Sequence, residues 1–222
     1  MKKKHIIIAI VIASCLIMGL IDAIIRPGYL VKSMVKLPLF LLIPIIYSLF
    51  NKRVNLKKLV IPSKKGIINA LSVGVLVFVV ILGGYFLLKE VFDFSKVTTA
   101  LTGDVGVTAN NFVWVAIYIS FVYSFLEEFF FRGFSFITLK KETSRSFAYL
   151  FSSLAFALYH IAMMIGWFDW YVVALAIVGL VIGGMIFNYF NEKNENIYMS
   201  WLIHMFANFG INTIGFILFG II

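Results

Sequence analysis

The sequence is poor in charged residues and has a single cysteine, and each shortage excludes classes of protein. Charged side chains make up 13% of the 222 residues, whereas 62% are hydrophobic. One water-soluble core cannot bury that much apolar surface, so a soluble enzyme and a disordered tail are both excluded. Cys15 alone permits no internal disulfide and no cysteine-rich zinc or iron–sulfur site. Any metal would therefore need histidine and carboxylate ligands.

Acidic residues are also scarce, since 19 Lys and Arg face 10 Asp and Glu and give a net charge of +9. The basic residues stand in short clusters between apolar runs. That pattern is typical of loops beside anionic lipid headgroups, and it does not indicate a nucleic-acid partner.

Long apolar runs dominate what is present, and a spanning helix needs about 20 such residues. They cover residues 6–25, 30–50, 67–88, 112 to about 134, 147–165, 171–190 and 197–222. The sequence therefore predicts an all-α, polytopic transmembrane helix bundle of seven to eight spans. The last run leaves the count open, because it is long for one span and Gly210, Asn212 and Gly215 could break it. Pro38 and Pro44 predict a kink in the second span.

The positions of Lys and Arg predict the orientation in the cell membrane. With the N-terminus in the cytoplasm, the inner segments hold 14 of these residues and the outer segments hold 5, as the positive-inside rule requires. The start of the chain also resembles a signal peptide with a lipoprotein-type cleavage site before Cys15. The run stays apolar past Cys15, however, which favours a retained first helix.

Ionisable residues at membrane depth cost a few kcal/mol each on insertion scales, so the few that occur are informative. Asp22 lies near the end of the first run, where it can reach the interface. The others form three groups, which are Glu127 with Glu128 and Arg132, then His160, and then His204 with Asn208.

The spacing of the first group assigns different surroundings to its two carboxylates. Glu128 and Arg132 are four residues apart, so on a helix they share a face and can form an ion pair. Glu127 points about 100° away and has no built-in cation. We expect the pair to fix the local structure and Glu127 to be free to act as a general base.

The other two groups add histidines on separate spans. Phe156 and His160 share one helix face, as do His204 and Asn208. A histidine and an amide side by side are suited to holding a developing oxyanion. Together the groups indicate peptide-bond hydrolysis inside the membrane. Each group also has a plainer interpretation, namely a structural ion pair, a hydrogen-bonded histidine, or an asparagine that holds helices together.

Three motifs in this order resemble those of one known family. They are Glu127-Glu128-x-x-x-Arg132, Phe156-x-x-x-His160 and His204-x-x-x-Asn208, and they lie between residues 112 and 210. The set is similar to the CPBP (Abi) family of CAAX proteases and bacteriocin-processing intramembrane proteases.

The resemblance implies a role for each matched residue. Glu127 and His160 would activate the attacking water, Glu128 and Arg132 would support them, and His204 and Asn208 would hold the oxyanion. These residues would lie in an intramembrane catalytic cavity. We therefore expect residues 1–110 to form an N-terminal part of three spans and a loop, and residues 111–222 to form the catalytic core.

The cofactor and the biological role stay open in the sequence. The family is usually classified among the metalloproteases. This resemblance implies that zinc could bind to Glu127, His160 and His204 together with a water, or the site could work without metal. The expected partners are the lipid bilayer and a membrane-embedded peptide or protein substrate. A rhomboid-type serine protease is set aside because no glycine follows Ser135, and a transporter because no inverted repeat is found. A non-catalytic bacteriocin immunity or cell-surface regulatory protein is the alternative.

Overall fold

The computed structural model describes residues 3–51, 56–61 and 66–222, and all regular structure in these residues is helical. Seven helical segments are long and apolar enough to cross a membrane. They are Lys3–Ile25, Tyr29–Phe50, Ile67–Leu88, Phe112–Thr138, Arg145–Met164, Trp170–Lys193 and Tyr198–Leu218. The predicted all-α polytopic bundle is confirmed, and the spans follow the apolar runs closely.

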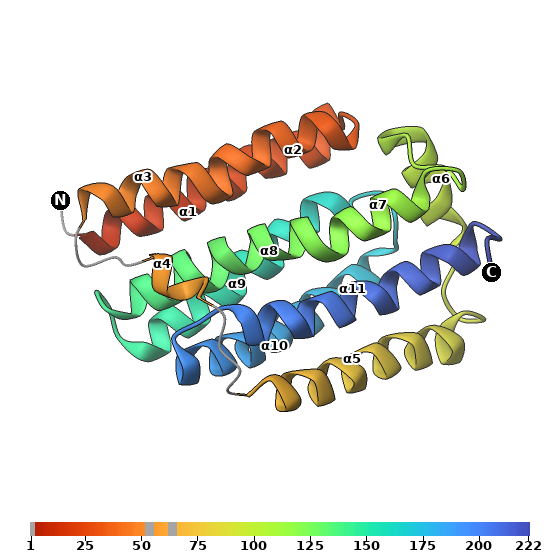
Figure 1. Cartoon of the computed structure of the whole chain (residues 1–222). Helices are drawn as coiled ribbons and strands as arrows, with labels where there is room; N and C mark the ends of the chain where they lie inside the picture. The colour runs from red at the N-terminus through yellow and green to blue at the C-terminus, as the bar shows by residue number, and fades with distance from the viewer. Residues whose placement is uncertain (1–2, 52–55, 62–65) are drawn as a thin grey trace.

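Several spans are built from more than one helical segment (Figure 1). The segments in chain order are α1 (Lys3–Leu20), η1 (Ile21–Ile25), α2 (Tyr29–Leu37), η2 (Pro38–Leu42), α3 (Ile43–Phe50), α4 (Leu56–Leu59), α5 (Ile67–Leu88), α6 (Ser95–Val105), α7 (Phe112–Tyr118), η3 (Ile119–Tyr123), α8 (Ser124–Glu127), η4 (Glu128–Thr138), α9 (Arg145–Met164), α10 (Trp170–Asn194) and α11 (Tyr198–Leu218). The four segments labelled η are π-helical. Pro38 begins one of them, so the second span accommodates this proline by a local π-helical turn.

The last span settles the question of seven or eight crossings for the described residues. α11 runs unbroken through Gly210, Asn212 and Gly215, so a break at these residues, which the sequence left open, does not occur. The loop between α5 and α7, which carried no predicted structure, contains α6.

Two basic residues that the orientation count placed in loops lie inside the bundle instead. Lys36 and Arg132 are fully buried within spans. Without these two, the inner segments hold 13 Lys and Arg residues and the outer segments hold 4, which favours the same orientation. Five of the counted residues lie outside the described ones, namely Lys2, Lys52, Arg53, Lys64 and Lys65.

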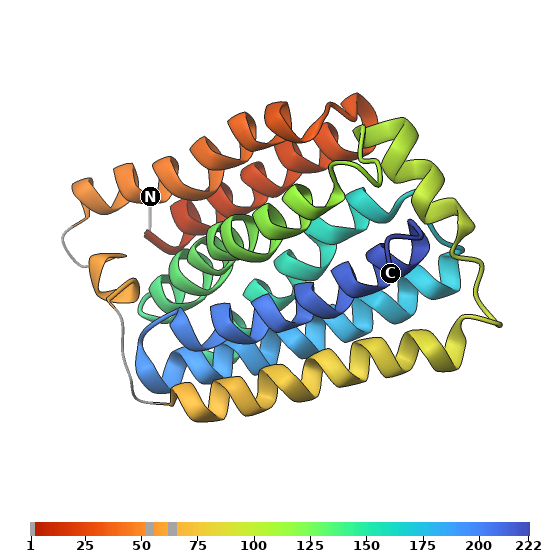
Figure 2. The ribbon, with the colours of Figure 1, turned by 45° about the vertical axis from the view of Figure 1, so that its right-hand side comes forward.

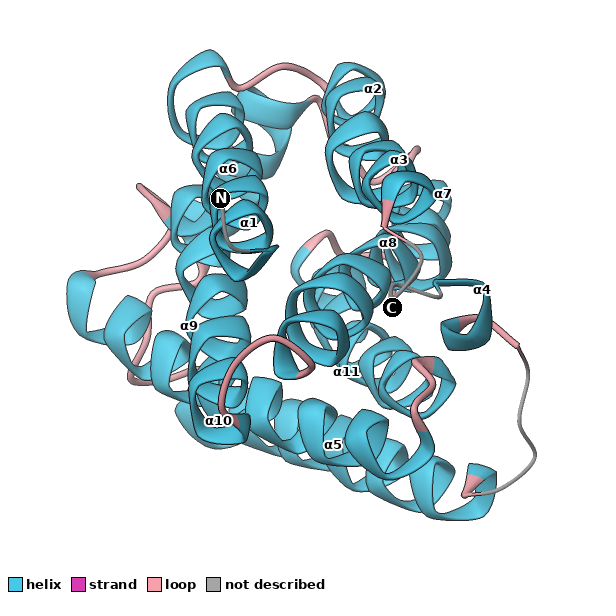
Figure 3. Ribbon diagram, turned by 90° about the vertical axis from the view of Figure 1, so that its left-hand side faces the viewer, coloured by secondary structure: helices cyan, strands magenta, loops and turns pink. Residues whose placement is uncertain are grey.

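The span Phe112–Thr138 runs between neighbouring spans (Figures 1 and 2), and its second half is buried inside the bundle. All eleven residues of η4 are buried, and η4 contacts α1, α4, α9, α10 and η2. Aromatic rings fill much of this core, and the Phe40 and Phe130 rings stack with centroids 4.2 Å apart. α1 and α10 both pack on α9, and α5 packs on α11 at the edge of the bundle, as the end-on view shows (Figure 3).

Glycines let α5 and α11 approach closely, as small residues do between membrane helices. A Cβ added at Gly210 would lie 3.1 Å from Ile81 Cγ2, whereas one at Gly83 would meet no atom within 4 Å. We expect Gly210→Leu to lower the free energy of unfolding by about 1–3 kcal/mol and Gly83→Leu to leave it nearly unchanged. Thermal unfolding in detergent measures both, and equal Tm values for the two variants would contradict this packing.

Candidate active site

The two glutamates lie where the central span changes its helical geometry. Glu127 ends the short helix α8, and Glu128 begins the π-helical segment η4. A second π-helical segment, η3, precedes α8. π-Helical turns are rare and frequently occur at functional sites, because the extra residue per turn redirects side chains.

Glu127 is buried and contacts three basic side chains from three other spans. Its Oε1 accepts a hydrogen bond from Lys36 Nζ at 2.5 Å. Its Oε2 lies 3.7 Å from His160 Nε2 and 3.8 Å from His204 Nε2. The expectation that Glu127 is free is therefore wrong, because α2 supplies the cation that its own helix does not.

Lys36 is the site residue that sequence analysis missed. It lies within the apolar run 30–50, but the orientation count placed it among the basic residues of the outer segments. The signal that could have found it is the apolar sequence on both sides, with Met34 and Val35 before it and Leu37 after it. A lysine embedded in such a run must find a partner inside the protein.

Glu128 contacts both Arg132, on its own span, and His204, on the last span. Its Oε2 lies 3.4 Å from Arg132 Nε, the contact that the i, i+4 spacing predicts. Its Oε1 accepts a hydrogen bond from His204 Nδ1 at 2.9 Å, a contact that the sequence did not predict. The Arg132 guanidinium is fully buried and lies over the rings of Phe156 and Phe187, at 3.9 and 4.9 Å from their centroids.

Phe156 and His160 lie on one face of α9, as predicted. His160 Nδ1 is 2.7 Å from the Phe156 carbonyl oxygen, and because a carbonyl only accepts, Nδ1 carries the proton. In the neutral ring Nε2 therefore presents its lone pair toward Glu127 Oε2. The Phe156 ring also lies edge-on to His204, with centroids 5.9 Å apart.

Asn208 takes a different partner from the other predicted residues. Its Nδ2 donates to the Ile119 carbonyl oxygen of η3 at 3.3 Å. Asn212, one turn further along α11, donates to Ser120 Oγ at 3.0 Å. The face of α11 that carries His204 is thus hydrogen-bonded to the central span. The structure joins six predicted residues in one cluster, and Asn208 lies one turn beyond it.

A comparison with known protein families matches the part of the chain that carries these residues. Residues 109–210 match the model of the family described as Rce1-like, type II CAAX prenyl endopeptidase. Residues 109–210 belong to the CAAX protease family. No curated protein and no solved structure matches the chain. All three sequence motifs fall within the matched residues, so the match supports a peptidase, and the seven apolar spans indicate a multi-pass membrane protein.

The side chains around Glu127 do not fit a metal ion. Among the residues that the structure describes, no three His, Cys, Asp or Glu side chains are arranged to hold one. The Lys36 ammonium already neutralises Glu127 Oε1, and a divalent cation beside it would be repelled. The possible zinc ligands of the sequence analysis, Glu127, His160 and His204, therefore do not fit a zinc site in this arrangement.

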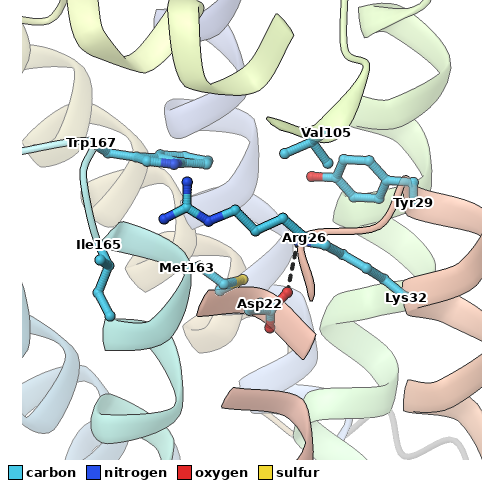
Figure 4. A pocket seen from close by; sticks show the side chains of 8 residues that line it. All are labelled: Asp22, Arg26, Tyr29, Lys32, Val105, Met163, Ile165 and Trp167. Atoms are coloured by element: carbon cyan, nitrogen blue, oxygen red, sulfur yellow. Dashed lines mark ion pairs between the residues drawn. The ribbon is translucent and has the colours of Figure 1, made fainter. Parts of the chain in front are cut away.

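A small pocket lies where the ends of the first two spans meet the end of α9. It is lined by Asp22, Arg26, Tyr29, Lys32, Val105, Met163, Ile165 and Trp167 (Figure 4). Asp22 pairs with Lys32 at 2.8 Å instead of reaching the interface. Lys32 is one turn before Lys36, so the pocket lies just beyond the cluster along α2, although none of the predicted site residues lines it.

Proposed function

We propose that the protein is an endopeptidase that hydrolyses peptide bonds of membrane-associated peptides or proteins with a water activated by Glu127 and His160. One observation carries the proposal: Glu127 Oε2 faces the Nε2 atoms of His160 and His204, at 3.7 and 3.8 Å, inside a membrane bundle. Such separations exceed a hydrogen bond, and one water that hydrogen-bonds to both atoms can bridge each of them.

The nucleophile is this water. Glu127 Oε2 and neutral His160 Nε2 both accept hydrogen bonds, so one water donates to both and keeps a lone pair for the substrate carbonyl. As its oxygen bonds to the carbonyl carbon, the proton passes to Glu127. Glu127 then returns the proton to the leaving amide nitrogen as the C–N bond breaks.

His204 stabilises the negative charge that develops on the carbonyl oxygen. Its Nδ1 is hydrogen-bonded to Glu128, and an imidazolium held in this way has a donor at Nε2. Arg132 pairs with the other oxygen of Glu128 and holds this carboxylate in place. Asn208 is proposed to give the second N–H of its amide to the same oxygen, because Ile119 uses only one of the two.

The catalytic core in this proposal is residues 111–222, with residues 1–110 as the N-terminal part. No step passes through a metal ion. The alternative is a non-catalytic immunity or regulatory role. The cleavage assay distinguishes it from the protease.

The test of the function is cleavage of a broad library of membrane peptides by the purified chain in lipid nanodiscs. We expect cleavage of peptide bonds that lie within or next to the bilayer, read as new product masses. The absence of cleavage for every peptide would contradict the proposal and favour the alternative.

Addition of a strong zinc chelator to the same assay separates the two cofactor hypotheses. We expect kcat to stay within about twofold of the untreated value, because the side chains of the site supply base and oxyanion donors without a metal. Complete loss of cleavage that added zinc restores would show that the metal-free mechanism is wrong.

We also propose that the protein lies in the cell membrane with its N-terminus in the cytoplasm, because the side of the bundle that carries the N-terminus has the excess of Lys and Arg. Reporter fusions at Lys3 and at the α5–α6 connection are expected to report cytoplasmic and external locations, respectively. The reverse pattern would contradict this orientation.

A further inference from the structure

Lys36 is a lysine without solvent contact in a chain that spans a membrane. Its side chain is 1% exposed, and that of its partner Glu127 is 7% exposed. A charged lysine at such a place is costly unless an opposite charge compensates it. The 2.5 Å contact with Glu127 Oε1 provides that charge.

Aromatic rings surround the rest of the Lys36 ammonium. Nζ lies 3.9 Å from the centroid of the Tyr123 ring, 5.4 Å from that of Tyr159 and 5.5 Å from that of Phe40. Such contacts are attractive cation–π interactions, and they are stronger where water is excluded. The Tyr123 hydroxyl is in turn 3.0 Å from Ser33 Oγ on α2, which fixes the ring. The ammonium is therefore held in place from several sides.

The contact selects one oxygen of the glutamate. Because Lys36 holds Oε1, the other oxygen, Oε2, is the one that faces His160 and His204. Without the ammonium, the Glu127 carboxylate is free to rotate about its terminal bond and to pair with either histidine directly. The orientation that leaves room for a water between these groups would then be lost.

We propose that Lys36 is a positioning residue of the reaction, which holds Glu127 Oε1 and directs Oε2 toward the attacking water. The inference rests on the proposed function. It extends the site beyond residues 109–210, since Lys36 belongs to the second span. The N-terminal part of the chain thereby supplies one group of the active site.

A neighbouring ion pair provides a matched control. Lys32 is one turn before Lys36 on α2, and it pairs with the buried Asp22 at 2.8 Å. Both pairs join a lysine of α2 to a carboxylate of another span, but only Glu127 faces the two histidines. A merely structural role predicts similar behaviour for the two lysines, whereas a positioning role does not.

The experiment compares Lys36→Met, Lys36→Arg and Lys32→Met in nanodiscs, with the library peptide that the wild-type chain cleaves fastest. We expect Lys36→Met to lower kcat about 100-fold, the size of effect that small misplacements of reacting groups produce, with KM within about threefold. Lys36→Arg restores the charge with a different shape and is expected to recover part of kcat. Lys32→Met is expected to keep kcat within about threefold of wild type.

The outcomes distinguish this inference from the proposed function. Wild-type kcat in Lys36→Met, together with loss of cleavage in Glu127→Gln, would overturn the role of Lys36 and leave the protease proposal intact. Cleavage by Glu127→Gln at the wild-type rate, or no cleavage by the wild-type chain, would overturn the proposed function and the inference with it. If Lys36→Met does not fold, Lys36→Gln replaces it. A wild-type kcat in folded Lys36→Gln would likewise overturn the role of Lys36.

Discussion

Replacement of Glu127 by glutamine is expected to lower kcat for peptide cleavage by about 10²–10⁴-fold, the contribution typical of a general base. Glutamine keeps the shape of the side chain but cannot take a proton from water. The substitution also leaves Lys36 without its carboxylate partner at 2.5 Å, so Tm is expected to fall by a few degrees while the helical content is retained. Initial rates and circular dichroism measure the two effects.

Glu192 supplies the control for this substitution. It is a carboxylate of the same chain that also pairs with basic groups, namely Lys140 at 3.2 Å and Arg145 at 2.8 Å. It lies near the end of α10, away from the Glu127 cluster. Glu192→Gln is expected to retain wild-type kcat, and an equal loss in both variants would mean that Glu127 acts only through the fold.

Replacement of Arg132 by alanine is expected to lower the free energy of unfolding by about 3–5 kcal/mol, the cost of removing one partner of a buried ion pair. Glu128 would lose its Oε2 contact, and the rings of Phe156 and Phe187 would lose the guanidinium between them. Since Glu128 also orients His204, cleavage should fall as well. Thermal unfolding and initial rates measure both effects.

Arg145→Ala is the matched control for Arg132→Ala. Arg145 also pairs with a glutamate, but its side chain is 64% exposed, and exposed pairs contribute about 0–1 kcal/mol. Equal Tm values for wild type and Arg132→Ala would show that His204 alone satisfies Glu128.

The fold was largely predictable because the bilayer imposes a simple constraint. Each span needs about 20 apolar residues, and every backbone polar group must be paired within a helix. The apolar runs therefore predicted all seven spans. Hydropathy does not report helix type, however, so the π-helical segments around Glu127 were not predicted. Nor does it detect a helix such as α6, which is neither long nor uniformly apolar.

The site was predictable where its contacts are local and unpredictable where they are not. The spacing from Glu128 to Arg132 and from Phe156 to His160 predicted contacts that the structure contains. The contact of Glu127 with Lys36 joins residues 91 positions apart, and helical spacing carries no information on which spans meet. The hydrogen bond between Glu128 and His204 was missed for the same reason.

The most direct test of the account is a side-by-side measurement of one membrane peptide with the wild-type chain and with Glu127→Gln in the same nanodiscs. The account predicts that product masses from hydrolysis appear with the wild-type chain and are about 10²–10⁴-fold slower to appear with the variant. Product formation at the wild-type rate by a folded Glu127→Gln chain would contradict it.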